Sequence, residues 1–238
     1  MKGLAINIGA NTTLPGIRGP IYPDGTFCYL PIPERAATAV DPPTYSDLTV
    51  PFEIPERYHD LPIHLDPTFA EYPLCHDYTY GDEHGVKAGP ISRLGSGDYL
   101  FFYATLTTTG EPEFDWIPPE WGAYLIGHFR LASDPVTGPP ERELTDREQA
   151  TFAANAHLKR DPVDARVLVQ GDPAESKLYD RAIPISSPAS GSTPGQIITT
   201  HTMDSGAGPW WRRPLEIPDP EPLLGWWQQR ESSDTSSL

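Results

Sequence analysis

Residues 94–132 read LGSGDYLFFYATLTTTGEPEFDWIPPEWGAYLIGHFRLA and contain two apolar, aromatic-rich runs separated by a loop. The first run, YLFFYATL, follows a Gly-Asp turn, and the second, AYLIGHFRLA, follows a loop that carries Trp116 and Trp121. Short apolar runs bounded by turn residues are typical of strands with buried faces. The stretch therefore predicts two neighbouring strands of a sheet or small barrel.

The rest of the chain favours short strands and long ordered loops. Its 238 residues include 29 prolines and 20 glycines, which interrupt helices and strands, while 38% hydrophobic residues are enough for a core. We expect an α+β fold with a mainly antiparallel sheet or partly open β-barrel, one clear helix and long Pro-rich loops. We assign residues 1–208 to a single domain and residues 209–238 to a Trp-rich C-terminal extension with a frayed end.

The charge of the chain is strongly acidic. There are 33 acidic residues against 17 basic ones, and the formal net charge is -16. Only Lys2, Lys87, Lys159 and Lys177 are lysines, which favours adaptation to high intracellular salt, as in a haloarchaeal protein, over an acidic mesophile protein. Such a charge disfavours nucleic-acid binding, but concentrated salt screens it, so a local basic cluster still acts.

The sequence predicts neither a metal nor a cofactor. Cys28 and Cys75 have no metal-ligand spacing, and the chain lacks the zinc-deaminase signature, HExxH, GxSxG and the dinucleotide-binding fingerprint. No segment approaches the about 18 consecutive apolar residues that span a membrane. We expect a cytoplasmic protein that does not bind membranes.

Local patterns predict several further elements. Residues 2–8 favour an opening strand, residues 23–25 (PDG) a hairpin turn, and residues 165–172 a strand. Thr145 and Glu148 form a capping-box pattern, which predicts a helix that continues to Asp161-Pro162. Residues 173–182 are interpreted as a short helix or turn.

Several motifs occur in one order over about residues 1–190: INIGANTT, GPIYPDGTFCYLPIPE, YTYGD, LGSGDYLFFYATL, YLIGHF, NAHLKR and VLVQGDPAESKLYDRAIPIS. Together they resemble the third class of the nucleotide-modification-associated domain families. The resemblance implies a link to systems that make, handle or recognise modified nucleotides in DNA, but it implies no particular reaction.

A second resemblance concerns the fold. GDYLFFYATL followed by YLIGHF is similar to the PUA-like group, including EVE and ASCH domains, which are small barrels that often read a base. The alternative is a Gly-Asp turn between two core strands of an unrelated β protein.

The motif NAHLKR is one candidate binding site. On the expected helix, Asn155 and Lys159 share a face, and His157 and Arg160 lie on a neighbouring one. Asn can read a base edge, Lys and Arg can hold phosphate, and His can transfer a proton near neutral pH. The alternative is a solvated helix end whose basic residues complement the helix dipole.

The motif TYGD is a second candidate. Tyr80 and Asp82 precede His84 and Lys87, a set that suits acid/base chemistry or a sugar contact. The alternative is a turn anchored by the aromatic ring and capped by the carboxylate.

Three further residues complete the predicted nucleotide site. Arg18, after GANTT, is a candidate phosphate contact, and Trp116 or Trp121 in the loop between the two apolar runs is a candidate for stacking on a base.

Three functions remain open. In the leading hypothesis the protein recognises a nucleotide or a modified base in DNA: Lys159, Arg160 and Arg18 hold phosphate, and Asn155 and Tyr80 read the base or sugar. The second is an enzyme on nucleotides or DNA with Asp82 or His157 as general acid/base. The third is a scaffold in a modification or defence complex, whose contact patch for a protein partner comprises Trp210, Trp211, Trp226 and Trp227.

Overall fold

The computed structural model describes residues 1–139 and 142–232. They form two compact units, each assembled from segments distant in the sequence. Unit 1 comprises Met1–Leu30, Phe101–Gly127 and the chain from Tyr179 onward, and unit 2 comprises Pro31–Leu100 and His128–Leu178. Three of the four boundaries between the units fall inside strands, and each unit is described below by itself.

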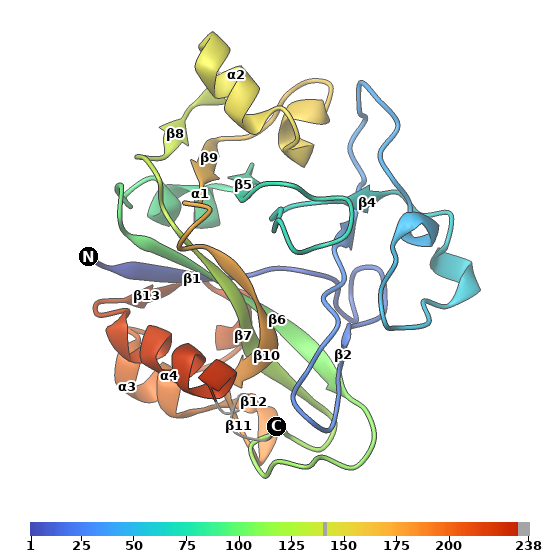
Figure 1. Cartoon of the computed structure of the whole chain (residues 1–238), viewed down its shortest axis with the longest axis vertical. Helices are drawn as coiled ribbons and strands as arrows, with labels where there is room; N and C mark the ends of the chain where they lie inside the picture. Colours follow the sequence, from blue (N-terminus) through green and yellow to red (C-terminus); the bar gives the residue numbers. More distant parts are fainter. Residues whose placement is uncertain (140–141, 233–238) are drawn as a thin grey trace. The chain divides into compact units, whose positions relative to one another are not determined.

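Unit 1 contains most of a six-stranded sheet with the strand order β10-β7-β6-β1-β13, in which β2 pairs with β6 (Figure 1). Its strands are β1 (Gly3–Asn7), β2 (Pro20–Ile21), β6 (Tyr99–Thr108), β7 (Trp121–Arg130), β10 (Lys177–Pro184) and β13 (Leu215–Ile217). β1 and β13 pair antiparallel, with Leu4 opposite Glu216. The segment after residue 208 thus contributes a strand to the sheet.

The two strands predicted from the apolar runs are confirmed. β6 and β7 are adjacent and antiparallel, because the Thr108 amide donates to the Glu120 carbonyl (3.0 Å) and the Leu131 amide donates to the Asp98 carbonyl (2.9 Å). Eight consecutive residues of β6 are buried, so both faces of this strand are covered, as expected for a continuous apolar run.

The remaining elements of unit 1 are short. They are β11 (Ser186–Ser187), β12 (Ser190–Pro194), α3 (Gln196–His201), the 3-10 turn η5 (Trp210–Arg212) and α4 (Glu221–Ser232). α3 and α4 lie side by side (Figure 1), and the rings of His201 and Trp226 meet edge to face at 5.2 Å. Trp210 is fully buried and its indole N–H donates to the Ser192 carbonyl (3.0 Å).

Unit 2 is built on a three-stranded antiparallel sheet with the order β5-β9-β8. Its strands are β3 (Ile32–Pro33), β4 (Ile63–His64), β5 (Thr79–Asp82), β8 (Val136–Thr137) and β9 (Val167–Gln170). Its helices and turns are η1 (Tyr45–Asp47), η2 (Glu56–Tyr58), α1 (Gly85–Ile91), α2 (Asp146–Phe152) and η4 (Ala156–Lys159). Phe152 of α2 packs with Leu168 of β9 in a small core.

The helix predicted from Thr145 is correct at its start and wrong at its end. The Thr145 side chain accepts from the Glu148 amide, and the Glu148 carboxylate accepts from the Thr145 amide (2.8 Å). However, α2 stops at Phe152, and Asn155 begins the separate turn η4 as its N-cap. Asn side chains compete with helical backbone hydrogen bonds, and here the Asn155 oxygen accepts from the His157 amide (3.0 Å).

The helix or turn predicted over residues 173–182 is correct for residues 173–175, which form a turn, and wrong from Lys177 onward, where β10 begins and pairs with β7. Pairing in the sheet overrides a weak local preference for helix or turn. The opening strand and the strand over residues 167–170 are confirmed, and the Pro23–Gly25 turn is present, with the Gly25 amide donating to the Tyr22 carbonyl (3.0 Å).

The α+β class with mainly sheet structure is confirmed. Within the described residues no sheet closes into a barrel, and the PUA-like resemblance is not confirmed. Of the helices formed by these residues, none has both the length and the apolar character needed to cross a membrane. Fraying was predicted for residues 231–238: Glu231 and Ser232 instead end the helix α4, and residues 233–238 lie outside the described part.

Candidate functional site

The predicted site residues fall into two groups. Unit 2 contains the residues from the TYGD and NAHLKR motifs: Tyr80, Asp82, Lys87, Asn155, His157, Lys159 and Arg160. Unit 1 contains Arg18, Trp116 and Trp121. We therefore treat the two groups as separate candidate sites.

In unit 2, β5 and η4 bring the two motifs together around charged side chains that the sequence analysis did not select. We call the set formed by Glu34, His64, Asp66, Glu83, His157, Arg160 and Asp164 the ionic cluster. The imidazole rings of His64 and His157 meet edge to face, with centroids 4.7 Å apart. Both rings and the Asp66 carboxylate are buried, whereas Glu83 and Asp164 are about one-third exposed at 30% and 33%.

Asp66 lies at the centre of the ionic cluster and is held by hydrogen bonds to its carboxylate. The Gly81 amide donates to its Oδ2 (2.9 Å), and Asn155 Nδ2 donates to its Oδ1 (3.1 Å). A side chain at residue 81 would not fit, because a Cβ there would lie 2.8 Å from the Cδ2 atom of His157. Glycine in the TYGD motif is therefore explained by close packing against η4.

Each histidine of the ionic cluster is oriented by a second carboxylate. His64 Nδ1 lies 2.6 Å from Glu34 Oε2, and His157 Nδ1 lies 2.8 Å from Asp164 Oδ1. Their Nε2 atoms face Asp66 Oδ2, at 3.9 Å for His64 and 3.4 Å for His157.

Arg160 is bound by two carboxylates. Its Nη2 donates to Glu34 Oε1 (3.0 Å), its Nε approaches both Glu34 oxygens, and its Nη1 donates to Asp164 Oδ2 (2.7 Å). Burial alone would raise the pKa of Glu34, but the hydrogen bonds from His64 and Arg160 outweigh it and hold that pKa well below its ordinary value. A phosphate would have to compete with Glu34 and Asp164 for this guanidinium.

The charge state of His157 follows from the same contacts. Burial alone would lower its pKa, but hydrogen bonds to Asp164 and Asp66 raise the pKa of His157 to about 10. At neutral pH the protonated ring therefore predominates and is a proton donor rather than a general base. Of the two roles predicted for His157 from the sequence, general acid and general base, its charge state therefore allows that of the general acid.

Asp82 lies at the end of β5 and binds three groups. The Tyr80 hydroxyl donates to its Oδ2 (2.6 Å), the His84 amide donates to its Oδ1 (2.7 Å), and Lys87 Nζ is 3.7 Å from Oδ2. Burial, followed by the charge of Asp82, raises the pKa of Tyr80 well above its usual value. Tyr80 and Lys87 thus both contact Asp82, with Tyr80 and Asp82 on the strand β5 and Lys87 on the helix α1.

Lys159 ends η4 and is half-buried. Because η4 is a separate turn, Asn155 and Lys159 do not share the face of one continuous helix. Asn155 is fully buried and binds Asp66, so its amide serves the ionic cluster.

Unit 1 contains a cavity of about 540 Å³, which we call the aromatic cavity. Its lining includes Phe114, Trp116, Arg181, Gln196, Ile197 and Trp226. Phe114 and Trp116 are stacked, with centroids 5.4 Å apart and planes inclined by 16°. The lining consists of described residues and includes no Asp, Glu, His or Lys side chain.

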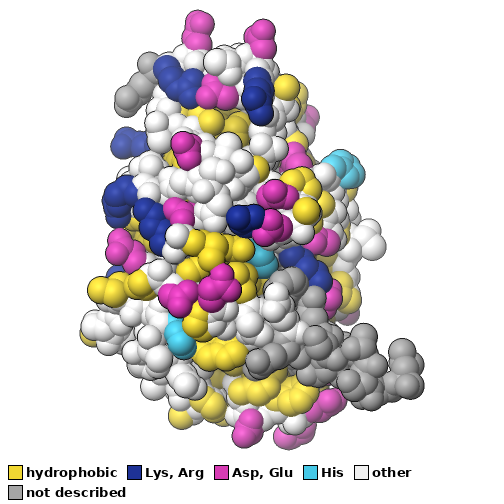
Figure 2. Space-filling view, turned by 60° about the vertical axis from the view of Figure 1, so that its left-hand side comes forward, with side chains coloured by type: hydrophobic (Ala, Val, Ile, Leu, Met, Phe, Trp, Pro, Cys, Tyr) yellow, Lys and Arg dark blue, Asp and Glu magenta, His cyan; other side chains and the backbone are white. Residues whose placement is uncertain are grey.

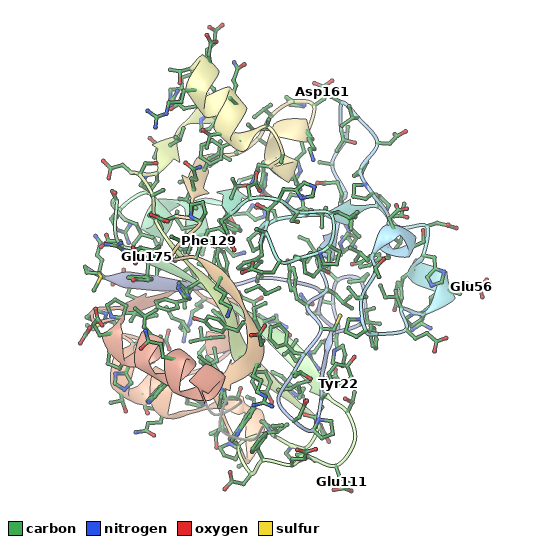
Figure 3. All side chains as sticks on the ribbon, viewed as in Figure 1. Tyr22, Glu56, Glu111, Phe129, Asp161 and Glu175 are labelled. Carbon is green, nitrogen blue, oxygen red and sulfur yellow. The ribbon has the colours of Figure 1, made fainter. Side chains whose placement is uncertain are left out.

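Trp116 reaches the aromatic cavity because the β6–β7 loop packs against the Pro23–Gly25 turn. The Glu113 amide donates to the Pro23 carbonyl (3.1 Å), and Figure 3 shows Tyr22 and Glu111 at the same end of unit 1. Gly25 has φ +82°, and a Cβ on it would lie 2.8 Å from the Trp116 ring. The turn residue therefore fixes both the backbone and the position of the indole.

Arg18 and Trp121 contact each other elsewhere in unit 1. The Arg18 guanidinium lies 4.5 Å from the centroid of the Trp121 ring, whose edge-to-face partner is Trp211 at 5.6 Å. Neither Arg18 nor Trp121 belongs to the lining of the aromatic cavity given by the described residues. Of the four tail tryptophans proposed as a partner surface, Trp210 is fully buried, Trp226 lines the cavity, and the Trp227 side chain lies outside the described part.

Surface charge on the face drawn in Figure 2 is mixed. Basic side chains are interspersed with acidic ones there, and hydrophobic side chains form several patches. This arrangement gives the described part of that face no continuous basic track of the kind that duplex DNA binding uses.

Two residue groups can hold a metal ion by their geometry. The ligand atoms of His64, Asp66 and His157 lie within 4.8 Å of one another, as do those of Glu83, His157 and Asp164. The sequence analysis missed them because His64 and Asp66 are far from His157 in the chain. The sequence HLD at residues 64–66 could have indicated the first group, because His64 and Asp66 are two residues apart and such residues point to the same side of extended backbone.

Comparison with known proteins gives one match. No curated protein and no solved structure matches the chain. The family model described as nucleotide modification associated domain 3 matches residues 2–222, which is most of the 238 residues. The chain therefore belongs to the nucleotide modification associated domain 3 family.

Proposed function

We propose that the protein recognises a nucleotide, or a modified base in DNA, by taking the base into the aromatic cavity of unit 1. The observation that carries this proposal is a cavity of about 540 Å³ that combines stacked aromatic rings with one guanidinium. Small-molecule sites typically have volumes of about 300–1,000 Å³ and mostly apolar walls with a few polar groups. Membership of a nucleotide-modification family is consistent with such a ligand.

Stacking supplies the affinity in this proposal. Phe114 is 38% exposed and already lies parallel to Trp116, so a base can extend the aromatic stack without reorganising it. Stacking of one base on an aromatic side chain contributes about 1–3 kcal/mol and tolerates different bases. Trp116 was predicted to stack on a base, and its place in the cavity lining supports that role.

Polar side chains supply orientation. Arg181 on β10 can bind a phosphate or the acceptor edge of a guanine, and Gln196 at the start of α3 can bind a base edge. One cationic side chain in the lining suits a single nucleotide better than a long phosphate backbone.

The lining favours recognition over catalysis. Among the described residues that line the cavity, only Arg181 is charged, and its guanidinium stays protonated and does not act as an acid or base. The alternative, an enzyme that uses Asp82 or His157, would place its chemistry in unit 2. The observation in its favour is that Tyr80 lies within hydrogen-bonding distance of Asp82 and Lys87 lies within ion-pair distance of it.

A binding assay tests the proposal. The full chain is titrated calorimetrically, at low salt and in molar KCl, with deoxynucleoside monophosphates carrying ordinary or 5-substituted pyrimidines, and with single-stranded and duplex oligonucleotides. Mass spectrometry of the same samples detects any conversion. We expect binding of at least one nucleotide class, and Trp116→Ala should weaken it by about 5- to 150-fold, which corresponds to the stacking energy.

Matched variants separate the cavity from general effects. Arg181→Ala should also weaken binding, whereas Arg212→Ala removes an equal charge from an exposed position of unit 1 and should not. Binding that is equally strong in Trp116→Ala and wild type would contradict the cavity as the site. Conversion that is lost in Asp82→Asn would favour the enzyme instead.

A further inference from the structure

We propose that His64, Asp66 and His157 form a binding site for a divalent transition-metal ion, with Glu83 on its exposed side. The inference does not rest on the proposed nucleotide site, because the ionic cluster and the aromatic cavity belong to different units. It rests on the geometry of the ligand atoms, the orientation of the two imidazoles and the balance of charge around them.

The ligand atoms have the spacing that a shared ion requires. Asp66 Oδ2 lies 3.4 Å from His157 Nε2 and 3.9 Å from His64 Nε2, and Glu83 Oε2 lies 3.4 Å from His157 Nε2. Ligands at about 2.0–2.1 Å from a tetrahedral zinc ion are about 3.3 Å apart. The separation between Asp66 and His157 therefore fits a bound ion, the separation between Asp66 and His64 needs a small inward movement of His64, and Glu83 is placed against His157.

The orientation of the rings places their Nε2 atoms as ligands. An ionised carboxylate only accepts hydrogen bonds, so Nδ1 of His64 must donate to Glu34 and Nδ1 of His157 must donate to Asp164. Arg160 nitrogen atoms also approach the Nδ1 atoms, but at longer distances of 3.3 Å for His64 and 3.2 Å for His157. Histidines that bind metals are usually held in this way by an outer carboxylate.

The space between the Nε2 atoms and Asp66 calls for a cation. The Nε2 atoms of both rings face the same oxygen of the buried Asp66 carboxylate, and an arrangement of this kind favours a positive charge between the rings and the carboxylate. The Nε2 proton of His157 occupies only one of the two separations, and a metal ion that binds this nitrogen would displace it. A metal ion bridges both.

The charges of the ionic cluster also favour a divalent ion. The ionic cluster contains four carboxylates, those of Glu34, Asp66, Glu83 and Asp164, and one guanidinium, that of Arg160. With the protonated ring of His157 this leaves two uncompensated negative charges, and with a divalent ion in place of the ring proton it leaves one. The divalent ion therefore reduces the uncompensated charge, and buried charges persist only when they are paired.

The ligand set selects the class of metal. Two imidazole nitrogens with one or two carboxylate oxygens suit zinc, iron, cobalt or manganese, whereas magnesium and calcium prefer oxygen ligands alone. Glu83 is 30% exposed, so the position that it occupies can be reached by water or another small ligand.

Direct metal analysis tests the site. The full chain, carrying no polyhistidine tag, is purified without chelator for metal content by mass spectrometry, and the chelator-treated protein is titrated with Zn²⁺ and Co²⁺. We expect one bound ion per chain, Co²⁺ absorption bands of a site with nitrogen and oxygen ligands, and a rise in melting temperature on adding metal. Failure of wild type to bind either ion stoichiometrically would overturn the proposal.

Variants locate the ion. His64→Gln and Asp66→Asn should abolish stoichiometric binding, and Asp164→Asn, which removes only an outer partner, should weaken it by about 10- to 100-fold. His76→Gln changes an exposed histidine of the same unit and should bind like wild type. Wild-type affinity in folded His64→Gln, or equal loss in His76→Gln, would refute the site. If the variants at buried residues do not fold, the Co²⁺ spectra of wild type and of Glu83→Gln test the site instead. A wild-type spectrum without nitrogen ligands would refute the site. An unchanged spectrum in Glu83→Gln would show that Glu83 is not a ligand.

Discussion

The ionic cluster of unit 2 and the aromatic cavity of unit 1 are built from opposite kinds of contact. In the cluster, Arg160, His157 and Asp66 are held by charged or polar partners at hydrogen-bonding distance, and little of their surface is exposed. In the cavity, stacked rings and aliphatic walls enclose a volume large enough for a small molecule. The ionic cluster is thus held together by pairs of opposite charges, whereas the aromatic cavity offers a volume whose aromatic walls suit a flat ligand.

The largest expected effect tests how tightly the ionic cluster is coupled. Arg160→Met leaves Glu34, a carboxylate with 2% of its side chain exposed, without its guanidinium partner. We expect a loss of about 3–5 kcal/mol in the free energy of unfolding, as found when one partner of a buried ion pair is removed. Urea denaturation monitored by circular dichroism measures this loss.

Arg142→Met is the matched control, because Arg142 pairs with Glu148 at the surface of the same unit. Screening by solvent makes such pairs weak, so this variant should unfold almost like wild type. Equal destabilisation by the two substitutions would show that the buried position of Arg160 is not what matters.

His128 is a buried histidine whose pKa is lowered, in contrast to that of His157, and we therefore expect acidic pH to destabilise the protein. Burial lowers the pKa of His128 to about 4, its Nε2 lies 2.9 Å from the Glu175 carbonyl, and Lys177 and the Tyr99 ring are its neighbours. Because the unfolded chain binds the proton near pH 6.5 and the folded chain does not, stability falls between pH 6.5 and 4, by up to about 3 kcal/mol.

The measurement is the difference between wild type and His128→Gln in free energy of unfolding at several pH values. That difference should shrink as the pH falls through this range, whereas His76→Gln, at an exposed position, should track wild type. A constant difference from pH 7 to 4 would contradict the lowered pKa.

Gly81→Ala tests whether the centre of the ionic cluster is as tightly packed as the distances imply. The added Cβ would lie 2.8 Å from His157 Cδ2 and 3.0 Å from Asn155 Oδ1. We expect a destabilisation of about 1–3 kcal/mol by overpacking, together with weaker metal binding. Gly89→Ala in α1, where a Cβ has no atom within 4 Å, should instead stabilise by up to about 1 kcal/mol. If Gly81→Ala left the free energy of unfolding unchanged, the turn η4 would have to move at little cost to make room for the added Cβ.

The parts of this molecule that sequence predicted are those whose pattern is local. The β6–β7 hairpin follows from two apolar runs, and the start of α2 follows from a capping box that needs only Thr145 and Glu148. The end of α2 and the strand β10 depend on partners far along the chain: Asn155 binds Asp66, and β10 pairs with β7. Local propensity contains no information about those partners.

The candidate sites likewise combine residues that local patterns predicted with residues that are brought in only by packing between distant parts of the chain. TYGD and NAHLKR do come together, but the histidine and carboxylates that complete the ionic cluster, His64, Asp66 and Glu34, were not selected from the sequence as site residues. Trp116 was selected from its loop, whereas Phe114 and Arg181 reach the cavity only through the packing of that loop beside β10.

The smallest expected effect concerns the wall of the aromatic cavity. Gly25→Ala introduces a Cβ 2.8 Å from the Trp116 ring at a residue with φ +82°, so it both strains the turn and displaces the indole. Gly208→Ala is the matched control: its φ is +60° and a Cβ there has no atom within 4 Å. Both variants should lose about 1–2 kcal/mol from backbone strain, but only Gly25→Ala should also weaken nucleotide binding, since stacking needs the indole in place. Calorimetry on both variants measures the two effects separately. Unaltered nucleotide affinity in Gly25→Ala would mean that nucleotide binding does not depend on the position of Trp116. The aromatic cavity would then no longer stand beside the ionic cluster as a site that depends on the shape of its walls.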